Sequence, residues 1–481
     1  MTQATPVHLV SLGCARNDVD SEELAGRLEA GGFRLVDEAE DAEAVLVNTC
    51  GFIEAAKADS INTLLAASDL KEHGSAKAVV AVGCMAERYG KELADELPEA
   101  DAVLGFDAYA DIDERLRSIL AGVRPQAHVP RDRRTLLPLS PVERQAALRP
   151  AQGTAPGQAQ EPEVTGSIAN TAARVQRRRL GSGPMAPLKL ASGCDRRCAF
   201  CAIPAFRGAY LSRRPTEIVA EAEWLVQHGV KEVFLVSENS SSYGKDLGDL
   251  RSLEKLLGEL SAVDGLEWIR VSYLQPAETR PDLIRAICST DKVVPYFDLS
   301  FQHASNPVLR RMRRFGDPGS FLALIDQVRA LAPTAGIRSN VILGFPGETE
   351  ADVQVLTDFL SAARLDAIGV FGYSDEDGTE AAGLPDKIDA DEVETRRAAV
   401  SDLAAELVDQ RAEERIGEAV RVLIEEVDEG GRPIGRAAHQ GPEVDGGCEL
   451  VGEPGTVSVG TLVSGTVVGS EGVDLIVEAQ R

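Results

Sequence analysis

Three cysteines lie close together in the string SGCDRRCAFC, with the spacing Cys-x-x-x-Cys-x-x-Cys: Cys194, Cys198 and Cys201. Three thiolates in such a stretch can hold three irons of a 4Fe–4S cluster and leave the fourth iron open to chelate a small molecule. The alternatives are a zinc site and a disulfide. Zinc favours a fourth Cys or His close by, and no histidine lies between His128 and His228. The spacing therefore favours an iron–sulfur cluster.

Three further cysteines follow apolar, β-branched runs: Cys14 comes after VHLVSL, Cys50 after AVLVNT and Cys84 after AVVAVG. Any one of them could be an ordinary buried thiol, since cysteine is often buried. Three at equivalent positions, spaced 36 and 34 residues apart, predict a second iron–sulfur cluster with three protein thiolates and one open iron. Cys288 and Cys448 have no partners of this kind, and we interpret them as core thiols.

Composition limits the class of protein. A chain of 481 residues with 44% hydrophobic residues is expected to form two to four domains with sizeable cores. No uninterrupted apolar run is long enough to span a membrane, and the N-terminus MTQATPVHLV does not resemble a signal peptide. Eight cysteines in a long chain without an export signal are expected to be reduced thiols in the cytoplasm, which favours ligands over disulfides. The net charge of −27 disfavours broad nucleic-acid binding and favours a basic partner.

Residues 1–123 alternate strand-like and helix-like segments, such as AVLVNT and DSEELAGRLEAGG. This alternation predicts an α/β domain with a parallel, doubly wound sheet. Ligands gather at the carboxyl ends of the strands in such sheets. We therefore expect Cys14, Cys50 and Cys84 to converge in one crevice.

Residues 124–186 contain tracts such as AQGTAPGQAQEPE and no aromatic residue. This composition cannot form a packed core, and it predicts a largely disordered linker rich in Pro, Ala and Arg. Its basic end, QRRR at 176–179, is expected to be a solvated patch, with a weak RNA contact as the alternative.

Strand–helix alternation returns in residues 187–411, with the candidate strands PLKLAS, EVFLVS, WIRVSYL, YFDLSF, RSNVILGF and AIGVFGY. Six such strands predict a partial (β/α)6 barrel, whose function lies at the carboxyl-end face, and the cysteine loop follows the first strand. Residues 412–481 contain short β-type runs separated by glycine-rich turns: VRVLIEEV, PIGRAA, GTVSVG, TLVSGTVVG and VDLIVEA. These runs predict a small antiparallel barrel of about five strands.

The spacing of Cys194, Cys198 and Cys201 is typical of radical S-adenosylmethionine (AdoMet) enzymes. Apart from the linker, the whole chain resembles the methylthiotransferases of that superfamily, which join a cluster domain, a radical AdoMet barrel and a TRAM domain. SLGCARNDVDSE, NTCGFI, CAIPAFRG, YLQPAE and FGYSDEDGTEAAGLPD are similar to the branch that modifies an aspartate of small-subunit ribosomal protein twelve. The transfer-RNA branch tends to show an aromatic residue and Gln-Met-Asn around its first cysteine. The linker is longer than usual, and Ala199 and Ala205 stand where polar or β-branched residues are expected.

The resemblance also implies an AdoMet pocket, in which the amino and carboxylate groups bind the open iron held by the 194–201 loop. Its implied contacts are Phe200, Ser237, Glu238, Gln302, Asn340 and Ile342. Phe200 stands where the superfamily brings its backbone against the adenine, and Ser237-Glu238 stands where many relatives carry Gly-Gly-Glu. Asn340 and Ile342 resemble half of the GxIxGxxE pattern behind the adenine.

Two further segments near this pocket have a structural and a functional interpretation. The string GFPGETE at 344–350 is expected to be a turn that caps a helix and also a ligand loop. Gln302 and His303 end the fourth barrel strand, where a lone histidine is more often structural.

The implied reaction is difficult, because the β carbon of an aspartate has an unactivated C–H bond that no side-chain base ionises usefully at neutral pH. A carbon radical can break this bond. The resemblance implies that the cluster of the 194–201 loop cleaves AdoMet to provide that radical. It also implies that an auxiliary cluster at Cys14, Cys50 and Cys84 presents sulfur to the substrate, and that a second AdoMet donates the methyl group.

The expected partners are a basic ribosomal protein of the small subunit, an electron donor such as a flavodoxin or ferredoxin, and a source of sulfide. Transfer RNA is not expected, because residues 412–481 carry 14 acidic and 5 basic groups and would repel a phosphate backbone. Two alternatives stay open: a transfer-RNA adenosine methylthiotransferase of the same architecture, and a non-catalytic iron–sulfur protein that binds the ribosome.

Overall fold

The computed structural model describes residues 4–135, 176–442, 444–452 and 457–480. They belong to two compact units. The first comprises Met1–Ser182, Ser192–Asp195 and Ala202–Leu211, and the second comprises Gly183–Ala191, Arg196–Cys201 and Ser212–Arg481. Cys194 belongs to the first unit, and Cys198 and Cys201 belong to the second.

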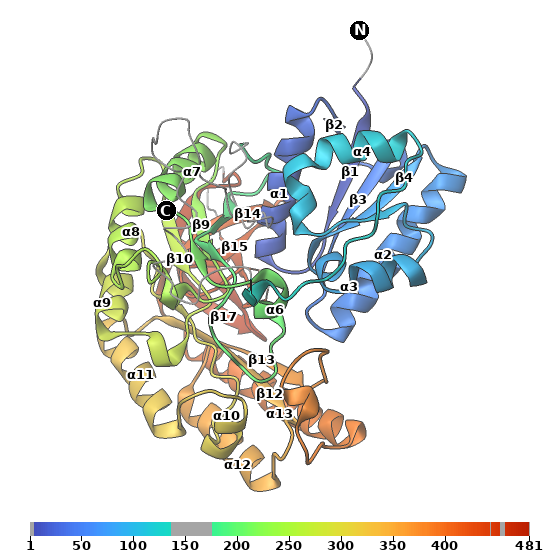
Figure 1. Cartoon of the computed structure of the whole chain (residues 1–481). Coiled ribbons are helices and arrows are strands. Elements are labelled where there is room, and N and C mark those ends of the chain that lie inside the picture. The colour runs from blue at the N-terminus through green and yellow to red at the C-terminus, as the bar shows by residue number, and fades with distance from the viewer. Residues whose placement is uncertain (1–3, 136–175, 443, 453–456, 481) are drawn as a thin grey trace, which may run out of the picture. The chain divides into compact units, whose positions relative to one another are not determined.

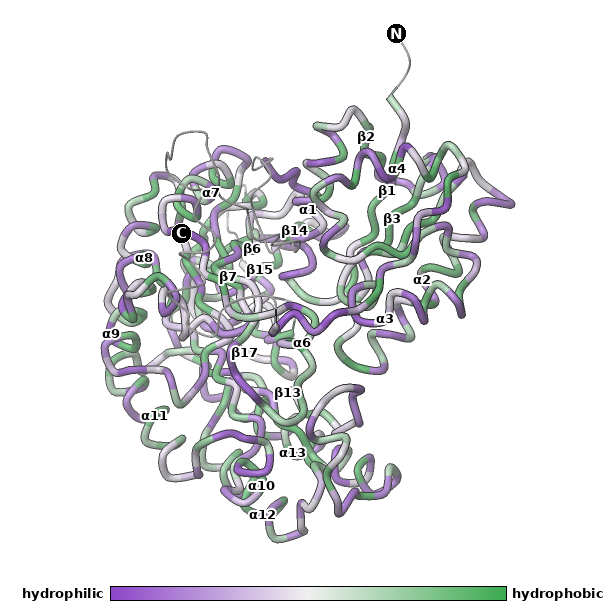
Figure 2. Tube along the Cα trace, viewed as in Figure 1, coloured by the Kyte–Doolittle hydropathy of each residue, from purple (hydrophilic) through white to green (hydrophobic). Residues whose placement is uncertain are grey.

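A five-stranded parallel sheet, in the order β2-β1-β3-β4-β5, forms the centre of the first unit (Figure 1). Its strands are β1 (Pro6–Ser11), β2 (Arg34–Leu35), β3 (Ala44–Thr49), β4 (Ala78–Val82) and β5 (Ala102–Val103). Every residue of β3 and β4 is buried, as expected for apolar strands that are covered on both faces. Figure 2 shows β1 and β3 as mostly hydrophobic segments.

Helices cover both faces of this sheet: α1 (Ala15–Ala30), α2 (Glu54–His73), α3 (Gly83–Glu96) and α4 (Ile112–Leu120). Leu24 of α1 and Leu116 of α4 belong to the core on one face. Leu64 of α2 and Leu93 of α3 belong to the core on the other face. The prediction of a doubly wound α/β domain is therefore confirmed.

Residues 124–135 and 176–182 of the predicted linker belong to the first unit, and residues 185–186 already form the start of a strand of the second unit. The central part, 136–175, lies outside the described residues. Arg133 is buried, and its Nε donates to Glu87 of α3 at 2.5 Å. Arg177 is also buried, and it forms an ion pair with Glu22 of α1 at 3.2 Å. The expectation of a solvated QRRR patch is therefore wrong at Arg177, because the buried Glu22 carboxylate holds its guanidinium out of water.

Six strands form a partial barrel in the second unit: β6 (Met185–Lys189), β9 (Glu232–Val236), β10 (Trp268–Val271), β11 (Tyr296–Asp298), β12 (Gly336–Leu343) and β13 (Ala367–Gly372). They form two parallel sheets, β10-β9-β6 and β11-β12-β13. Parallel bridges from Ile269 to Val293 and from Leu274 to Leu299 connect β10 with the segment around β11. The predicted partial (β/α)6 barrel is confirmed.

The helices that pack around these strands contribute to one continuous apolar core. They are α7 (Pro215–Gln227), α8 (Ser252–Ser261), α9 (Pro281–Ser289), α10 (Asn306–Arg311), α11 (Pro318–Leu331), α12 (Glu350–Ala363) and α13 (Ala390–Glu413). The cysteine segment adds three short elements: β7 (Ala191–Ser192), α6 (Ile203–Arg207) and β8 (Leu211–Ser212). Among the helices that the structure describes, none is long and apolar enough to cross a membrane.

The C-terminal strands close into a small barrel in the order β14-β15-β16-β18-β17. Its strands are β14 (Ala419–Val427), β15 (Pro433–Ala437), β16 (Cys448–Val451), β17 (Leu462–Glu471) and β18 (Asp474–Ala479). The five-stranded barrel is confirmed, although its β16–β18 pair is parallel rather than antiparallel.

One predicted strand of this barrel is wrong. The described part of GTVSVG, residues 457–460, contains no strand and ends in a turn at Gly460, whose φ of +85° favours glycine. The shorter segment CELV supplies β16 instead. Cys448 is fully buried in the barrel core, in agreement with its interpretation as a core thiol.

Candidate functional site

Cys14, Cys50 and Cys84 lie at the carboxyl ends of three neighbouring parallel strands. Cys14 follows β1 and caps α1, Cys50 follows β3, and Cys84 is the second residue of α3, directly after β4. Gly13 has a φ of +96°, and a Cβ at this position would lie 2.9 Å from the Cys50 sulfur. The missing side chain therefore lets the Cys14 loop approach Cys50. The structure brings the three predicted thiols to one edge of the sheet.

Burial and two arginines act on these thiols in opposite directions. Burial raises the pKa of Cys84 to about 11, and it also raises the pKa of Cys50. At Cys14 burial is outweighed by the charges of Arg16 and Arg207 and by backbone N–H groups, so the pKa of this thiol is lowered. The thiolate is the form that binds metal. The two arginines therefore favour the ligating form of the thiols.

Arg207 and Asn17 contact the Cys84 sulfur directly. Arg207 Nη2 donates to Cys84 Sγ at 3.0 Å, and it lies 3.0 Å from Asp20 Oδ2. Cys84 Sγ donates to Asn17 Oδ1 at 3.5 Å. Sequence reasoning missed both residues. The sequence signal for them is that Arg207 lies in the string CAIPAFRG and Asn17 in the string SLGCARNDVDSE. Neither string shows which atoms these side chains contact.

The donor set fits a cluster better than a single zinc ion. In the described segments, no three Cys, His, Asp or Glu side chains are gathered tightly enough to hold one metal ion. A tetrahedral zinc would bring its sulfur ligands to within roughly 4 Å of one another. An iron–sulfur cluster instead places each thiolate on a separate iron. One buried and two half-buried thiols beside two arginines are suited to such an anionic group.

In the first unit, backbone hydrogen bonds fix the beginning of the cysteine loop. Cys194 N–H donates to Gly208 O at 3.0 Å, and Tyr210 N–H donates to Asp195 Oδ1 at 3.1 Å. Gly193 has a φ of +79°, and a Cβ there would lie 2.6 Å from Gly208 O. A glycine is therefore required where the chain turns into Cys194.

In the second unit, Cys198 and Cys201 share a tight turn, in which Cys201 N–H donates to Cys198 O at 3.1 Å. Ala199 is buried between them, and its N–H donates to Met312 O at 3.0 Å. Arg314 Nη1 donates to Cys198 Sγ at 3.5 Å. Arg314 is another residue that sequence reasoning missed.

Glu278, in the string YLQPAE, collects three polar groups around its carboxylate. It accepts hydrogen bonds from Asn239 Nδ2 at 2.9 Å and from Ser242 Oγ at 2.6 Å, and it pairs with Arg196 of the cysteine loop. Burial opposes its ionisation, but these hydrogen bonds and the Arg196 charge lower the pKa of Glu278. Glu278 therefore ties Arg196 to the loop that follows β9.

Four of the six predicted AdoMet contacts lie close together. Gln302 N–H donates to Asn340 O at 3.0 Å, and Ile342 N–H donates to Gln302 O at 2.8 Å. Ile342 and Phe200 both pack against the small apolar cluster that contains Phe345. Gln302 has a φ of +71°, which is uncommon outside glycine and is often found at functional sites.

The other two predicted contacts, Ser237 and Glu238, are buried at the carboxyl end of β9. Ser237 Oγ accepts a hydrogen bond from Asn239 N–H at 3.2 Å and lies 3.0 Å from Ser240 Oγ. Asn340 Oδ1 and Asn239 Oδ1 are buried in the described structure without a hydrogen-bond partner. Such oxygens, one within β12 and the other in the loop after β9, are suited to a polar ligand, because an unpaired buried acceptor is costly.

The GFPGETE loop is a turn and a helix cap, as expected. Thr349 accepts from Asp352 N–H at 3.3 Å and begins α12 with a capping box. Glu348 Oε1 accepts from Gly344 N–H at 3.0 Å, and Glu348 Oε2 lies 3.3 Å from Nε2 of the buried His303. This pairing supports the structural interpretation of His303.

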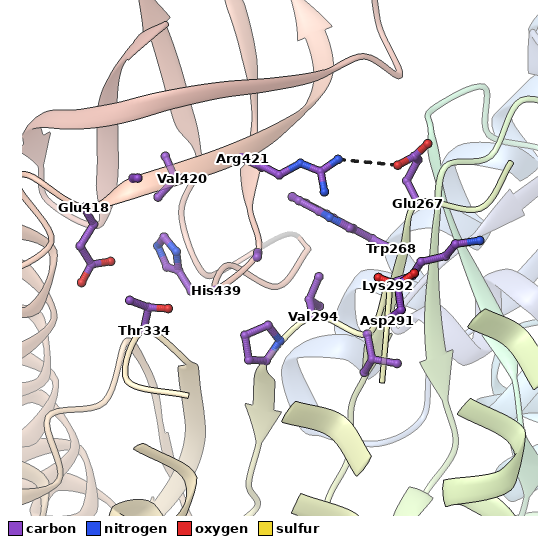
Figure 3. Close-up of a pocket in the computed structure, with 14 residues that line it drawn as sticks. Glu267, Trp268, Asp291, Lys292, Val294, Thr334, Glu418, Val420, Arg421 and His439 are labelled. Carbon is purple, nitrogen blue, oxygen red and sulfur yellow. Dashed lines mark ion pairs between the residues drawn. The ribbon is translucent and has the colours of Figure 1, made fainter. Parts of the chain in front are cut away.

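A pocket of about 450 Å³ lies at the opposite, amino-terminal ends of the barrel strands (Figure 3). Trp268 at the start of β10 and Thr334 before β12 line it from one side, and His439 lines it from the C-terminal barrel. Arg421 and Glu267 form an ion pair of 3.7 Å beside it. None of the predicted site residues lines this pocket, and function in such barrels lies at the other face.

Three family models match successive parts of the chain. Residues 6–105 match "Uncharacterized protein family UPF0004", residues 188–360 match the radical SAM superfamily, and residues 416–479 match the TRAM domain.

Relatives similar over the whole length share one name, "Ribosomal protein uS12 methylthiotransferase RimO". The protein from Cutibacterium acnes is 68% identical, over 98% of this chain and 97% of the relative. The proteins from Nocardioides sp. and Streptomyces coelicolor are 65% and 61% identical, over 98% and 99% of this chain and 96% and 97% of the relatives. The chain belongs to the RimO family. It is a radical SAM methylthiotransferase.

Membership of the RimO family favours the main hypothesis over both alternatives, the transfer-RNA enzyme and the non-catalytic protein. A solved structure of the radical AdoMet methyltransferase TsrM from Kitasatospora setae is also similar, with a TM-score of 0.51 and 15% identity. The match covers 76% of this chain and 73% of that chain. At this identity the likeness shows a shared fold alone.

Proposed function

We propose that this RimO-family enzyme inserts a methylthio group at the β carbon of an aspartate in ribosomal protein uS12. The 194–201 loop holds the 4Fe–4S cluster that binds AdoMet, and Cys14, Cys50 and Cys84 hold the auxiliary 4Fe–4S cluster. When bound, these groups supply a carbon radical, a sulfur atom and a methyl group. The observation that carries this assignment is the convergence of three thiols at the ends of β1, β3 and β4, beside Arg207.

The remaining predicted contacts would orient AdoMet. Phe200 and Ile342 provide apolar surface for the adenine, and the Asn340 oxygen provides a buried acceptor. Ser237 and Glu238 provide polar groups at the end of β9. Because hydrogen bonds hold the backbones of Gln302 and Asn340, this side of the pocket is preorganised.

The charge of the C-terminal barrel supports a basic protein substrate. Each arginine that the structure describes after residue 412 has a carboxylate partner: Arg415, Arg421, Arg432 and Arg436 pair with Asp366, Glu267, Asp428 and Glu232. Exposed carboxylates include Glu426, Glu429, Glu471 and Glu478. A surface of this kind attracts a basic protein and offers little to a phosphate backbone.

The decisive test is mass spectrometry of the product. Reconstituted enzyme with AdoMet, sulfide and a reductant should add about 46 Da to one aspartate of uS12, because SCH3 replaces hydrogen. Transfer RNA in a parallel reaction should stay unmodified. Modified transfer RNA together with unchanged uS12 would contradict the substrate assignment.

Salt should weaken the association with uS12, because screening shortens the range of surface charges to about 8 Å at physiological ionic strength. We expect the Kd to rise steadily with added NaCl in a binding titration. A variant carrying Glu426→Gln, Glu429→Gln, Glu471→Gln and Glu478→Gln should bind more weakly and respond less to salt. A Kd independent of salt would exclude electrostatic recruitment.

The reaction also requires reducing equivalents and sulfur. A flavodoxin or ferredoxin is suited to deliver single electrons to a low-potential cluster, and a sulfide source must replace the transferred sulfur. Ribosomal substrates would place this work in the cytoplasm.

A further inference from the structure

Arg207 lies on α6, in the segment that follows Cys201 in the chain, yet it packs within the first unit. Its side chain is only 6% exposed, and its guanidinium reaches the Cys84 sulfur at 3.0 Å. Ala202 and Phe206 of the same segment pack against Cys84 and close the site with apolar surface. The segment that follows the 194–201 loop thus completes the surroundings of Cys84.

Several contacts hold the guanidinium in this position. Asp20 Oδ2 lies 3.0 Å and Asn17 Oδ1 lies 3.1 Å from Arg207 Nη2, and the ring of Phe106 lies 5.2 Å from the guanidinium carbon. Asn17 is itself fixed, because its Nδ2 donates to Leu12 O at 2.7 Å and to Thr49 O at 3.2 Å. The donor is therefore preorganised by the ends of β1 and β3.

The two hydrogen bonds at the Cys84 sulfur respond differently to metal binding. A thiol can donate to Asn17 Oδ1, but a thiolate on iron has no proton to donate. The Arg207 N–H group still donates, because a thiolate remains an acceptor and arginine stays charged. Hydrogen bonds to cluster sulfurs and nearby charge are among the factors that set the reduction potential of a cluster.

We propose that Arg207 is a positioning residue of the auxiliary site, which donates a hydrogen bond to the Cys84 thiolate and raises the reduction potential of the cluster bound there. Because reduction adds a negative charge, the positive guanidinium stabilises the reduced state more than the oxidised state. The Asp20 carboxylate opposes this effect, because its Oδ2 lies 3.0 Å from the same Nη2 atom that donates to Cys84. The inference rests on the proposed function, since it presupposes a cluster at Cys14, Cys50 and Cys84.

The test uses the full-length chain with Cys194→Ala, Cys198→Ala and Cys201→Ala, so that the auxiliary cluster is measured alone. A redox titration followed by electron paramagnetic resonance gives its midpoint potential. Arg207→Met should lower the equilibrium constant for reduction about tenfold, which is about 59 mV for one electron. Arg207→Lys should give a smaller shift in the same direction, whereas Asp20→Asn should shift the potential in the positive direction.

Arg115→Met is the matched control, because Arg115 forms a partly exposed ion pair with Asp111 on the surface of the same unit. The midpoint potential of the cluster in the Arg115→Met variant should equal that in the parent protein. If the Arg207→Met variant does not bind the cluster, the midpoint potentials of the Arg207→Lys and Asp20→Asn variants test the proposal. Midpoint potentials equal to that of the parent in both variants would overturn it. A parent protein that binds no iron would instead refute the proposed function.

Discussion

Replacing Cys194, Cys198 and Cys201 together with alanine should remove about half of the roughly eight irons expected for two clusters. Cleavage of AdoMet to 5'-deoxyadenosine should fall to background. The physical reason is that the open iron, the chelating site for AdoMet, exists only when three thiolates hold the other irons. Iron analysis and chromatography of the nucleoside products measure the two effects.

The reciprocal change separates the two sites. Replacing Cys14, Cys50 and Cys84 with alanine should also remove about half of the iron, but cleavage of AdoMet should continue. Methylthio transfer to uS12 should be lost. Replacement of Cys288 and Cys448, which lie outside both groups, should leave the iron content unchanged. Full iron retention after loss of Cys14, Cys50 and Cys84 would show that no auxiliary cluster binds there.

The cysteine groups could be identified from sequence because their arrangement follows simple rules. Cys198 and Cys201 are close in the chain, so a turn brings them together. Cys14, Cys50 and Cys84 are distant in the chain, but each follows a strand of one parallel sheet. Parallel strands place their carboxyl ends at one edge, and strand periodicity therefore predicts proximity.

The arginines beside the thiols could not be identified in this way. Arg207 is 123 residues from Cys84, and Arg314 is 116 residues from Cys198. Neither lies in a repeated pattern, and an arginine in a soluble protein is usually exposed. Their contacts depend on how a side chain leaves α6 or the segment after α10, which only tertiary packing decides.

The prediction of one strand in the C-terminal barrel, GTVSVG, failed for a related reason. GTVSVG has strong β-type composition, whereas CELV is short and contains a glutamate. The barrel nevertheless uses CELV, because Cys448 and Leu450 point into its core and β16 pairs with both β15 and β18. Strand propensity reports how well a residue fits a half-buried surface, and neighbours across the sheet can override it.

Glu232 is a position at which a single change should have a large effect on stability. It is fully buried at the start of β9, and it binds Arg270 at 2.6 Å and Arg436 of β15 at 2.8 Å. Glu232→Gln should destabilise the second unit by roughly 3–5 kcal/mol, because two buried guanidiniums lose their shared counter-charge. Urea unfolding of the reconstituted enzyme measures this loss.

Two further variants test whether the unpaired charges cause this loss of stability. Glu449→Gln removes one of the two carboxylate partners of Arg432, an exposed arginine in the same barrel, and should cost less than about 1 kcal/mol. Replacing Glu232, Arg270 and Arg436 together with methionine should cost much less than Glu232→Gln, because no unpaired charge stays buried. Equal losses in the single and triple variants would indicate that packing, not charge, is responsible.

The contribution of Glu232 to the free energy of unfolding should decrease as the pH falls. Burial opposes its ionisation, but Arg270 and Arg436 together lower the pKa of Glu232 in the folded protein. A carboxyl group with a lowered folded pKa contributes its full stability above the unfolded pKa of about 4.3 and loses it as the pH falls. The difference in unfolding free energy between the parent and Glu232→Gln should therefore be constant near pH 7 and shrink below about pH 4. A difference that grows with acidification would show that Glu232 is protonated in the native enzyme and that the two arginines are neutralised by other groups.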